Sequence, residues 1–264
     1  MKALSQRRRH PLAAVALLLL GLLVTGGLYA AVSGANEAKA ASSTAYTADD
    51  ENQGEKLFIA NCATCHGMDA SGSANGPSLV GVGAASVDFQ VGTGRMPMAM
   101  QGPQAQQKPV QFTEEQTSQL AAYVASLGAG PAVPDAETVN AAAGNAAEGG
   151  ELFRVNCAMC HNAAGAGGAL TEGKFAPSLE GVSEKHIYEA MVTGPQNMPV
   201  FNDANISPED KQSIIAFLKN IEANGSPGGA ELGSLGPVSE GLFIWTAGLG
   251  LVIAFTIWLT ARSS

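Results

Sequence analysis

Two copies of a Cys-x-x-Cys-His motif constrain this chain more than any other feature. They begin at Cys62 and Cys157, and together they use all four cysteines of the 264 residues. Residues three and four apart share one face of a helical turn, so two thiols can bond one haem while the histidine reaches its iron. The motif is the attachment site of c-type haem. We therefore predict two covalently bound haem c groups, with His66 and His161 as iron ligands and with the attachment residues Cys62, Cys65, Cys157 and Cys160.

Three other uses of four cysteines fit the sequence less well. Disulfides within each motif would close only tiny loops, and disulfides between the motifs would leave both histidines unexplained. A four-cysteine zinc site places its pairs about 15–20 residues apart, whereas 91 residues separate Cys65 from Cys157. Thioredoxin-like chemistry needs a βαβ context, which neither flank indicates. Haem attachment is therefore the favoured interpretation.

The sequence around the two motifs is also duplicated. Gly54-x-x-Leu57-Phe58-x-x-Asn61-Cys62 matches Gly149-x-x-Leu152-Phe153-x-x-Asn156-Cys157, and Pro77-Ser78-Leu79 matches Pro177-Ser178-Leu179. Each copy ends in an i, i+3, i+4, i+7 apolar stripe behind a helix-start signal, Thr113-Glu114-Glu115 or Ser207-Pro208-Glu209. The stripes are Leu120, Tyr123, Val124 and Leu127, and Ile214, Phe217, Leu218 and Ile221. A duplicated helical domain explains all of these matches.

We place the two domains at residues 47–128 and 149–225, with linkers rich in Ala, Gly and Pro at residues 129–148 and 226–241. Strand signals are scarce, so the fold is predicted to be mainly α. Domains of this size have thin cores, and a covalently held haem supplies an apolar body for the helices to pack against. An insertion in the first copy, residues 98–112, is predicted to be a surface loop near its haem.

Each copy offers a methionine as the second iron ligand. A c-type iron usually takes its sixth ligand from a loop after the motif, and Met96 and Met198 both precede a proline at matching points of the repeat. Met98 and Met100 stay open as alternatives to Met96. Filling both axial positions with His and Met suits electron transfer and leaves no site for peroxide or oxygen, so no catalytic residue is predicted.

Two further predictions concern the surroundings of the iron. We expect the backbone carbonyls of Pro77 and Pro177 to accept a hydrogen bond from the other nitrogen of the ligand histidine, which would fix its orientation. His186 is the alternative ligand in the second copy. It lies in the polar sequence Ser-Glu-Lys-His-Ile-Tyr-Glu, which favours a solvated position on a helix face.

Both ends of the chain carry an apolar segment next to basic residues. Residues 11–32 are almost continuously apolar and follow Lys2 and three arginines at 7–9. Residues 1–35 fit a cleavable export signal as well as a retained anchor. Residues 242–261 hold no charge over 20 residues, enough to cross the roughly 30 Å hydrocarbon core as a helix. Basic residues at the outer ends of both segments place those ends in the cytoplasm, so the haem domains are predicted on the extracytoplasmic side of the cell membrane.

The part between the two segments is acidic. It contains nine of the 14 basic residues and all 23 acidic residues, a formal charge of −14. This balance disfavours nucleic acid as a partner and favours a protein with a basic patch. Export also agrees with haem attachment, because the thioether bonds are made on the outer side of the membrane.

Two class I cytochrome c domains, an amino-terminal apolar segment and one carboxy-terminal anchor resemble the dihaem cytochrome c subunit of the cytochrome bcc (bc1-type) menaquinol reductase of high-GC Gram-positive bacteria. The more specific elements are the Gly94-Arg95-Met96-Pro97 loop, the Gln-Gly-Pro-Gln-Ala insertion after it and the Asn197-Met198-Pro199 loop. The resemblance covers nearly the whole chain. It implies haem attachment at the four cysteines and iron ligation by His66, Met96, His161 and Met198.

The resemblance also implies partners. In that family, electrons enter from a Rieske iron-sulfur subunit working with cytochrome b and leave to an aa3-type cytochrome c oxidase. The chain itself would be an electron carrier, and quinol:cytochrome c reductase activity would belong to the complex. Three alternatives remain: the dihaem subunit of a cbb3-type oxidase, which usually has its anchor before the haem domains, a dihaem peroxidase, and a free-standing membrane-tethered carrier.

Overall fold

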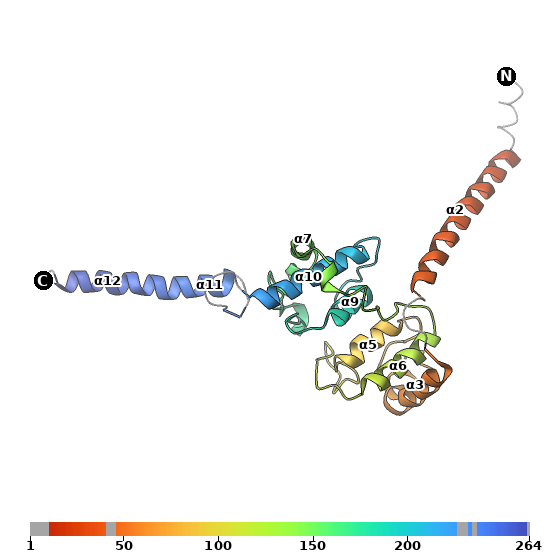
Figure 1. Ribbon diagram of the computed structural model, residues 1–264, viewed down its shortest axis with the longest axis horizontal. Coiled ribbons are helices and arrows are strands. Elements are labelled where there is room, and N and C mark those ends of the chain that lie inside the picture. The colour runs from red at the N-terminus through yellow and green to blue at the C-terminus, as the bar shows by residue number, and fades with distance from the viewer. Residues whose placement is uncertain (1–10, 41–45, 226–231, 234–236, 263–264) are drawn as a thin grey trace, which may run out of the picture. The chain divides into compact units, whose positions relative to one another are not determined.

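A computed structural model describes residues 11–40, 46–225, 232–233 and 237–262 (Figure 1). Among the described residues, helix is the main regular structure and strand is limited to β1 and β2, which confirms the prediction of a mainly α fold. It divides into two compact units, with the boundary after residue 45. The elements are α2 (Pro11–Ala40), α3 (Ala48–Asn61), α4 (Ala63–His66), α5 (Ala84–Gly92), α6 (Glu114–Ser126), η1 (Ala141–Ala143), α7 (Ala146–Asn156), α8 (Ala158–His161), β1 (Gly168–Ala169), η2 (Thr171–Gly173), β2 (Phe175–Ala176), α9 (Glu184–Thr193), α10 (Pro208–Asn224), α11 (Pro237–Phe243), the π-helix η3 (Ile244–Gly248) and α12 (Leu249–Arg262).

The first unit contains one long helix, α2. Residues Val15–Tyr29 of this helix form an apolar stretch. The basic residues that we used to orient this segment, Lys2 and the arginines at 7–9, lie outside the described residues.

The second unit contains two helical domains, the first built from α3 to α6 and the second from η1 to α10. We call them domain 1 and domain 2. The predicted helix starts are confirmed: Thr113 and Ser207 cap α6 and α10, and each exchanges hydrogen bonds with the residue three positions later. Such reciprocal caps satisfy amide groups that a helix end would otherwise leave without a partner.

In each domain, the helix before the motif packs against the last helix, α3 on α6 and α7 on α10 (Figure 1). The apolar stripes supply the contact. Phe58 and Tyr123 have ring centroids 5.2 Å apart, and Phe153 and Phe217 repeat this pair at 5.4 Å. Phe58 and Phe153 are almost completely buried, and each lies in a separate hydrophobic core.

A glycine makes each helix crossing possible. A methyl group at Gly54 would overlap the backbone carbonyl of Gln119, and one at Gly149 would overlap that of Ser213. The two backbones therefore approach more closely than any larger residue allows. The glycine of the duplicated Gly-x-x-Leu-Phe sequence is thus required because the same close helix crossing occurs in both domains.

The first predicted linker, residues 129–148, is packed along both domains. The carbonyl of Pro131 accepts a hydrogen bond from the Ala85 N–H of domain 1 at 3.0 Å. Further on, Val139 is buried in the core of domain 2, and residues 146–148 already form the first turn of α7. The composition rich in Ala, Gly and Pro suggested a spacer, but small residues also let a segment lie flat against other backbones.

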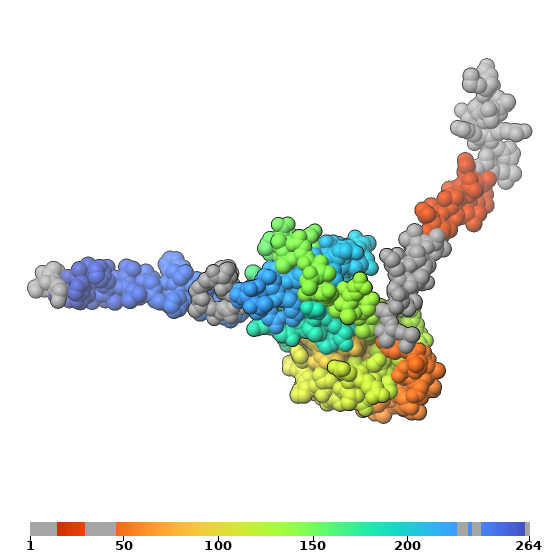
Figure 2. Space-filling view, in the orientation of Figure 1, coloured from red at the N-terminus to blue at the C-terminus, as the bar shows by residue number. Residues whose placement is uncertain are grey.

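Residues 237–262 form the carboxy-terminal helical segment. Within it, residues Ser239–Ala261 are long and apolar enough to cross a membrane, and none of their most apolar stretch is buried among the described residues (Figure 2). The helix begins at Pro237, so residues 237–241 belong to it and not to the second linker.

Candidate haem sites

Each Cys-x-x-Cys-His motif forms one helical turn directly after a longer helix. Cys62 ends α3, its N–H bonding to the Phe58 carbonyl at 2.7 Å, and the His66 N–H bonds back to the Cys62 carbonyl at 3.0 Å. Domain 2 repeats this with Cys157 and His161 at 2.9 Å. The first cysteine and the histidine of each motif therefore lie one turn apart, as haem attachment requires.

No disulfide joins any of the four cysteines. Burial, with a smaller contribution from the second cysteine of the motif, raises the pKa of Cys62 and of Cys157 to about 11. Thiol redox chemistry and zinc binding need the thiolate, which a lowered pKa favours. Burial of the first cysteine of each motif thus disfavours the thiolate that a thiol redox site uses.

The predicted contacts of the ligand histidines are confirmed. His66 Nδ1 lies 2.8 Å from the Pro77 carbonyl oxygen, and His161 Nδ1 lies 3.0 Å from that of Pro177. A ring that donates from Nδ1 to a carbonyl keeps the lone pair of Nε2 available for a metal. Burial also lowers the pKa of His161, which favours the neutral ring that binds iron.

The loop that carries the first carbonyl depends on a glycine. A methyl group at Gly76 would lie 2.8 Å from the Cys65 carbonyl oxygen and 3.1 Å from His66 Nδ1. Any larger residue would therefore push the loop away from the ring. In domain 2 Gly167 is similarly enclosed, because a methyl group there would lie 2.5 Å from the Ala176 carbonyl oxygen.

The predicted haem residues of domain 2 converge on a cavity of about 960 Å³, which Arg95 and Gln104 of domain 1 also line. Cofactor sites are typically apolar pockets of about 300–1,000 Å³ with a few placed polar groups. The cysteines and the imidazole of the motif and the thioether of the methionine loop are among the groups that line it. The lining includes Cys157, Cys160, His161, Met198, Phe153, Leu179, Ile187, Met191, Ile214 and Leu218. The residues present fit a haem held by two thioethers, an imidazole and a methionine.

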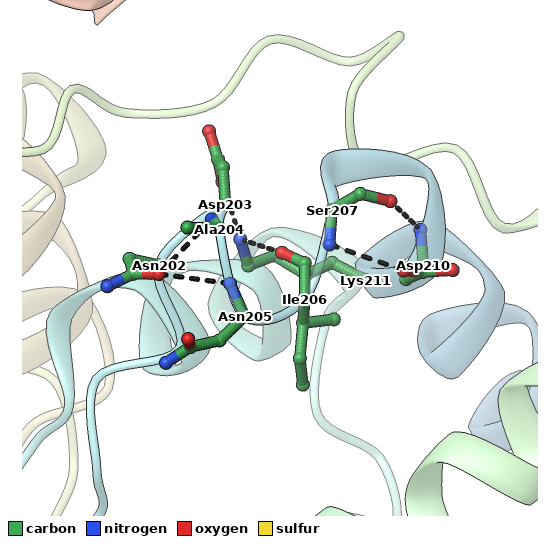
Figure 3. Close-up of polar contacts among 8 residues, drawn as sticks. All are labelled: Asn202, Asp203, Ala204, Asn205, Ile206, Ser207, Asp210 and Lys211. Atoms are coloured by element: carbon green, nitrogen blue, oxygen red, sulfur yellow. Dashed lines mark hydrogen bonds and ion pairs between the residues drawn. The ribbon is translucent and has the colours of Figure 1, made fainter.

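The Met198 loop is fixed by a buried lysine that the sequence analysis did not identify. Lys211 on α10 is completely buried, and its Nζ donates to Asp203 Oδ1 at 2.6 Å and to the Ile206 carbonyl at 2.9 Å (Figure 3). Ser207 caps α10 beside it (Figure 3). The loop after Met198 is thereby tied to the start of the last helix. A lysine four residues after a helix cap is usually solvated, so no local signal pointed to this role.

In domain 1, Met96 is the methionine that packs against the core. Its N–H donates to the Gln90 carbonyl at 2.9 Å. Met98 is half-buried but is not part of this cluster, and Met100 is 78% exposed. Packing thus favours Met96 among the three.

A buried cation lies in the same loop. Lys108 Nζ is buried and has no hydrogen-bond partner among the described residues. The Lys108 carbonyl lies so close to Gly94, two residues before Met96, that a methyl group there would overlap it. A carboxylate such as a haem propionate would satisfy this ammonium group.

The expectation for His186 was wrong, and the insertion makes a contact that the sequence did not predict. His186 is not solvated: only 19% of its side chain is exposed, because α5 of domain 1 packs against α9. Residues 98–112 extend beyond their own haem domain. Gln104 Nε2 donates to the Phe175 carbonyl at 2.9 Å, and the Phe175 N–H donates to Gln104 Oε1 at 2.9 Å. The insertion therefore docks on the β1–β2 hairpin of domain 2, an element that the sequence analysis missed.

Comparison with known proteins agrees with this geometry. Residues 52–128 match the family model for cytochrome c, and residues 144–218 match the model for cytochrome c oxidase, cbb3-type, subunit III. A protein of Corynebacterium efficiens named cytochrome bc1 complex cytochrome c subunit is 47% identical over 80% of this chain and 76% of its own length. A protein of the same name from Mycobacterium bovis is 42% identical over 98% of this chain and 94% of its own.

The chain belongs to the family of cytochrome bc1 complex cytochrome c subunits.

Membership of this family confirms the resemblance found in the sequence. The chain is a cytochrome c electron-transfer subunit of a membrane-bound reductase complex, carries covalently bound haem c and assembles with the other subunits of that complex. The cbb3-type match covers only domain 2, whereas the bc1-type relatives align across both domains.

Proposed function

We propose that the chain binds two haem c groups and passes electrons from a Rieske and cytochrome b core to an aa3-type cytochrome c oxidase. The observation that carries this proposal is the repetition of one arrangement in both domains. Each has a motif turn, a histidine whose Nδ1 contacts a proline carbonyl, and a methionine loop packed near the core.

In this proposal the haems are attached through Cys62 and Cys65 and through Cys157 and Cys160. His66 and Met96, and His161 and Met198, ligate the two irons. A haem held by these histidines and methionines would supply one-electron transfer. The chain's own residues hold the imidazole rings in orientation and exclude water from the site. This closed coordination argues against a dihaem peroxidase.

The proposed membrane arrangement places both haem domains on the extracytoplasmic side. It rests on the positive-inside rule, with Arg262 immediately after the apolar carboxy-terminal helix and basic residues before the amino-terminal segment. The acidic part between the segments then faces its electron-transfer partners.

The ligand assignment is tested by replacing Met198. In Met198→Ala, we expect the second haem to stay covalently attached but to become high-spin or to bind another ligand, because the cysteines are unchanged. Absorption and electron paramagnetic resonance spectra of the purified complex report the spin state. Met159→Ala is the matched control, since Met159 lies inside the second motif but is 92% exposed. An unchanged spectrum in Met198→Ala would refute the assignment of Met198 as the ligand.

Domain 1 allows the same comparison. Met96→Ala is expected to change the first haem, whereas Met100→Ala, at an exposed position, is expected to leave it unchanged. If only Met98→Ala or Met100→Ala changes the spectrum, Met96 is not the ligand.

Co-purification tests the partners. A tagged full-length chain extracted in mild detergent should bring with it cytochrome b, the Rieske protein and an aa3-type oxidase. Isolation without cytochrome b and the Rieske protein contradicts the proposal. A cbb3-type catalytic subunit in their place would support that alternative, and peroxide turnover by the isolated chain would support a peroxidase.

A further inference from the structure

Three metal-binding side chains meet where α5 of domain 1 contacts α9 of domain 2. Asp88 comes from α5, and His186 and Glu189 come from α9. His186 Nε2 lies 3.8 Å from Asp88 Oδ2 and 4.0 Å from Glu189 Oε2, and one ligand atom from each residue lies within 4.8 Å of the others. No member of the cluster is among the iron ligands that we propose, although His186 also lines the cavity of the second haem site.

Glu189 is the unusual member of the cluster. Its side chain is completely buried, and neither of its oxygens has a hydrogen-bond partner among the described residues. A buried carboxylate is costly unless a cation or a donor neutralises it. Burial, with the neighbouring Asp88 carboxylate, raises the pKa of Glu189 to about 10. The position between Glu189 and Asp88 thus requires either a shared proton or a bound cation.

The charged groups around the cluster do not meet this need. Lys185 Nζ lies 2.6 Å from Asp88 Oδ2, and its side chain is 41% exposed, so it reaches Asp88 from the solvent side. Arg95 is stacked over Phe89 at 4.8 Å from the ring centroid. Among the described residues, His186 is the one basic group within ion-pair distance of Glu189, and burial lowers its pKa and favours its neutral form.

A neutral imidazole beside two carboxylates is the donor set of a zinc ion with a mixed nitrogen and oxygen shell. Two ligand atoms of a tetrahedral zinc site lie about 3.3–3.6 Å apart, given zinc–ligand distances of about 2.0–2.2 Å. The observed separations of 3.8 and 4.0 Å approach this geometry within small side-chain rotations. Lys185, being half-exposed, can move into solvent when a cation neutralises Asp88.

We propose that Asp88, His186 and Glu189 form a Zn²⁺ site that joins the two haem domains. Because one ligand comes from domain 1 and two from domain 2, the site is complete only while α5 and α9 are in contact. It goes beyond electron transfer and shares no ligand with the proposed haem sites, so its failure would leave the proposed function untouched.

The test is a zinc titration of the purified complex after removal of metals with a chelator. Calorimetry should show one more Zn²⁺ bound per copy of this chain in the wild type than in Glu189→Gln, Asp88→Asn or His186→Gln. Loss of a ligand should weaken the site by more than about 100-fold, since removing only an outer partner of a ligand costs about 10–100-fold. Glu184→Gln, which removes an acid from the same helix but outside the cluster, should bind zinc like the wild type.

Two further measurements protect the test against misfolded variants. The haem absorption spectrum must be unchanged in each variant, and the two amide variants keep the shape of the side chains they replace. Zinc K-edge absorption of the wild type should show one imidazole and otherwise oxygen ligands. Equal zinc binding by the wild type and all three variants would overturn the proposal, as would binding of Ca²⁺ but not Zn²⁺.

Discussion

Replacing Gln104 tests whether the insertion of domain 1 holds the hairpin of domain 2. Both polar atoms of the Gln104 amide pair with the backbone of Phe175, one donating to its carbonyl and one accepting from its N–H, each at 2.9 Å. Gln104→Ala removes both bonds. Each neutral hydrogen bond contributes about 0.5–1.5 kcal/mol net, so the docked state loses about 1–3 kcal/mol.

The loss of docking free energy can be measured as a faster rate of amide hydrogen exchange. Since about 1.4 kcal/mol corresponds to a factor of ten, the Phe175 amide should exchange about 5- to 150-fold faster in Gln104→Ala, provided exchange requires undocking. Hydrogen exchange with mass spectrometry on peptides covering residues 168–176 of the purified complex measures the change. Gln104→Glu keeps an acceptor for the Phe175 N–H, so its effect on that amide should be smaller.

Gln101→Ala is the matched control, because Gln101 Nε2 bonds to the Asn75 carbonyl at 3.1 Å, within domain 1. It should leave residues 168–176 unchanged. The reasoning is refuted if Gln104→Ala exchanges at the wild-type rate, or if Gln101→Ala accelerates exchange equally.

Three other substitutions have expected outcomes. Gly149→Ala forces a methyl group against the Ser213 carbonyl and should destabilise domain 2 by about 1–3 kcal/mol or more, seen as a lower Tm, whereas Gly102→Ala, where the nearest atom is 3.9 Å away, should not. Lys211→Met leaves the Ile206 carbonyl without its hydrogen-bond donor and should lower the free energy of unfolding by about 1–3 kcal/mol. Denaturation curves measure this loss, and amide hydrogen exchange at residues 199–206 reports on the loop. An unchanged exchange rate in the loop would contradict the role of Lys211. Burial raises the pKa of Tyr188 to about 12, so between pH 10 and 12 the folded protein keeps a proton that the unfolded chain releases, and stability falls by about 1.4 kcal/mol per pH unit. In Tyr188→Phe, stability should therefore fall less between pH 9 and pH 11.5 than in the wild type. Denaturation curves at these two pH values measure the fall, and an equal fall in both proteins would contradict the reasoning.

Much of the site was predictable because its information is local. The spacing within each motif places Cys62 and His66 one turn apart, and the helix caps at Thr113 and Ser207 follow from residues three positions apart. The proline carbonyls opposite His66 and His161 were also predictable. Duplication helped in each case, because the same residues appear twice at matching points and coincidence becomes a poor explanation.

The features that the sequence did not reveal concern residues whose partners are distant in sequence. His186 lies in a polar stretch that resembles a solvated helix start, and it becomes buried only because domain 1 covers that face of α9. Gln104 is one glutamine among several in an insertion without periodicity, and its partner Phe175 is 71 residues away. A hydrogen bond over such a separation leaves no pattern in a single sequence.

By itself, then, the sequence determined the cofactor chemistry, the duplicated helical domain and the apolar segments, since each depends on residue spacing within a few helical turns. The tertiary structure alone decided how domain 1 meets domain 2. Its contacts are the packed linker, the hydrogen bonds between Gln104 and Phe175, and the buried cluster of Asp88, His186 and Glu189. The physical reason is that burial and charge neutralisation at an interface depend on which surfaces meet, and that is set by the packing of whole domains.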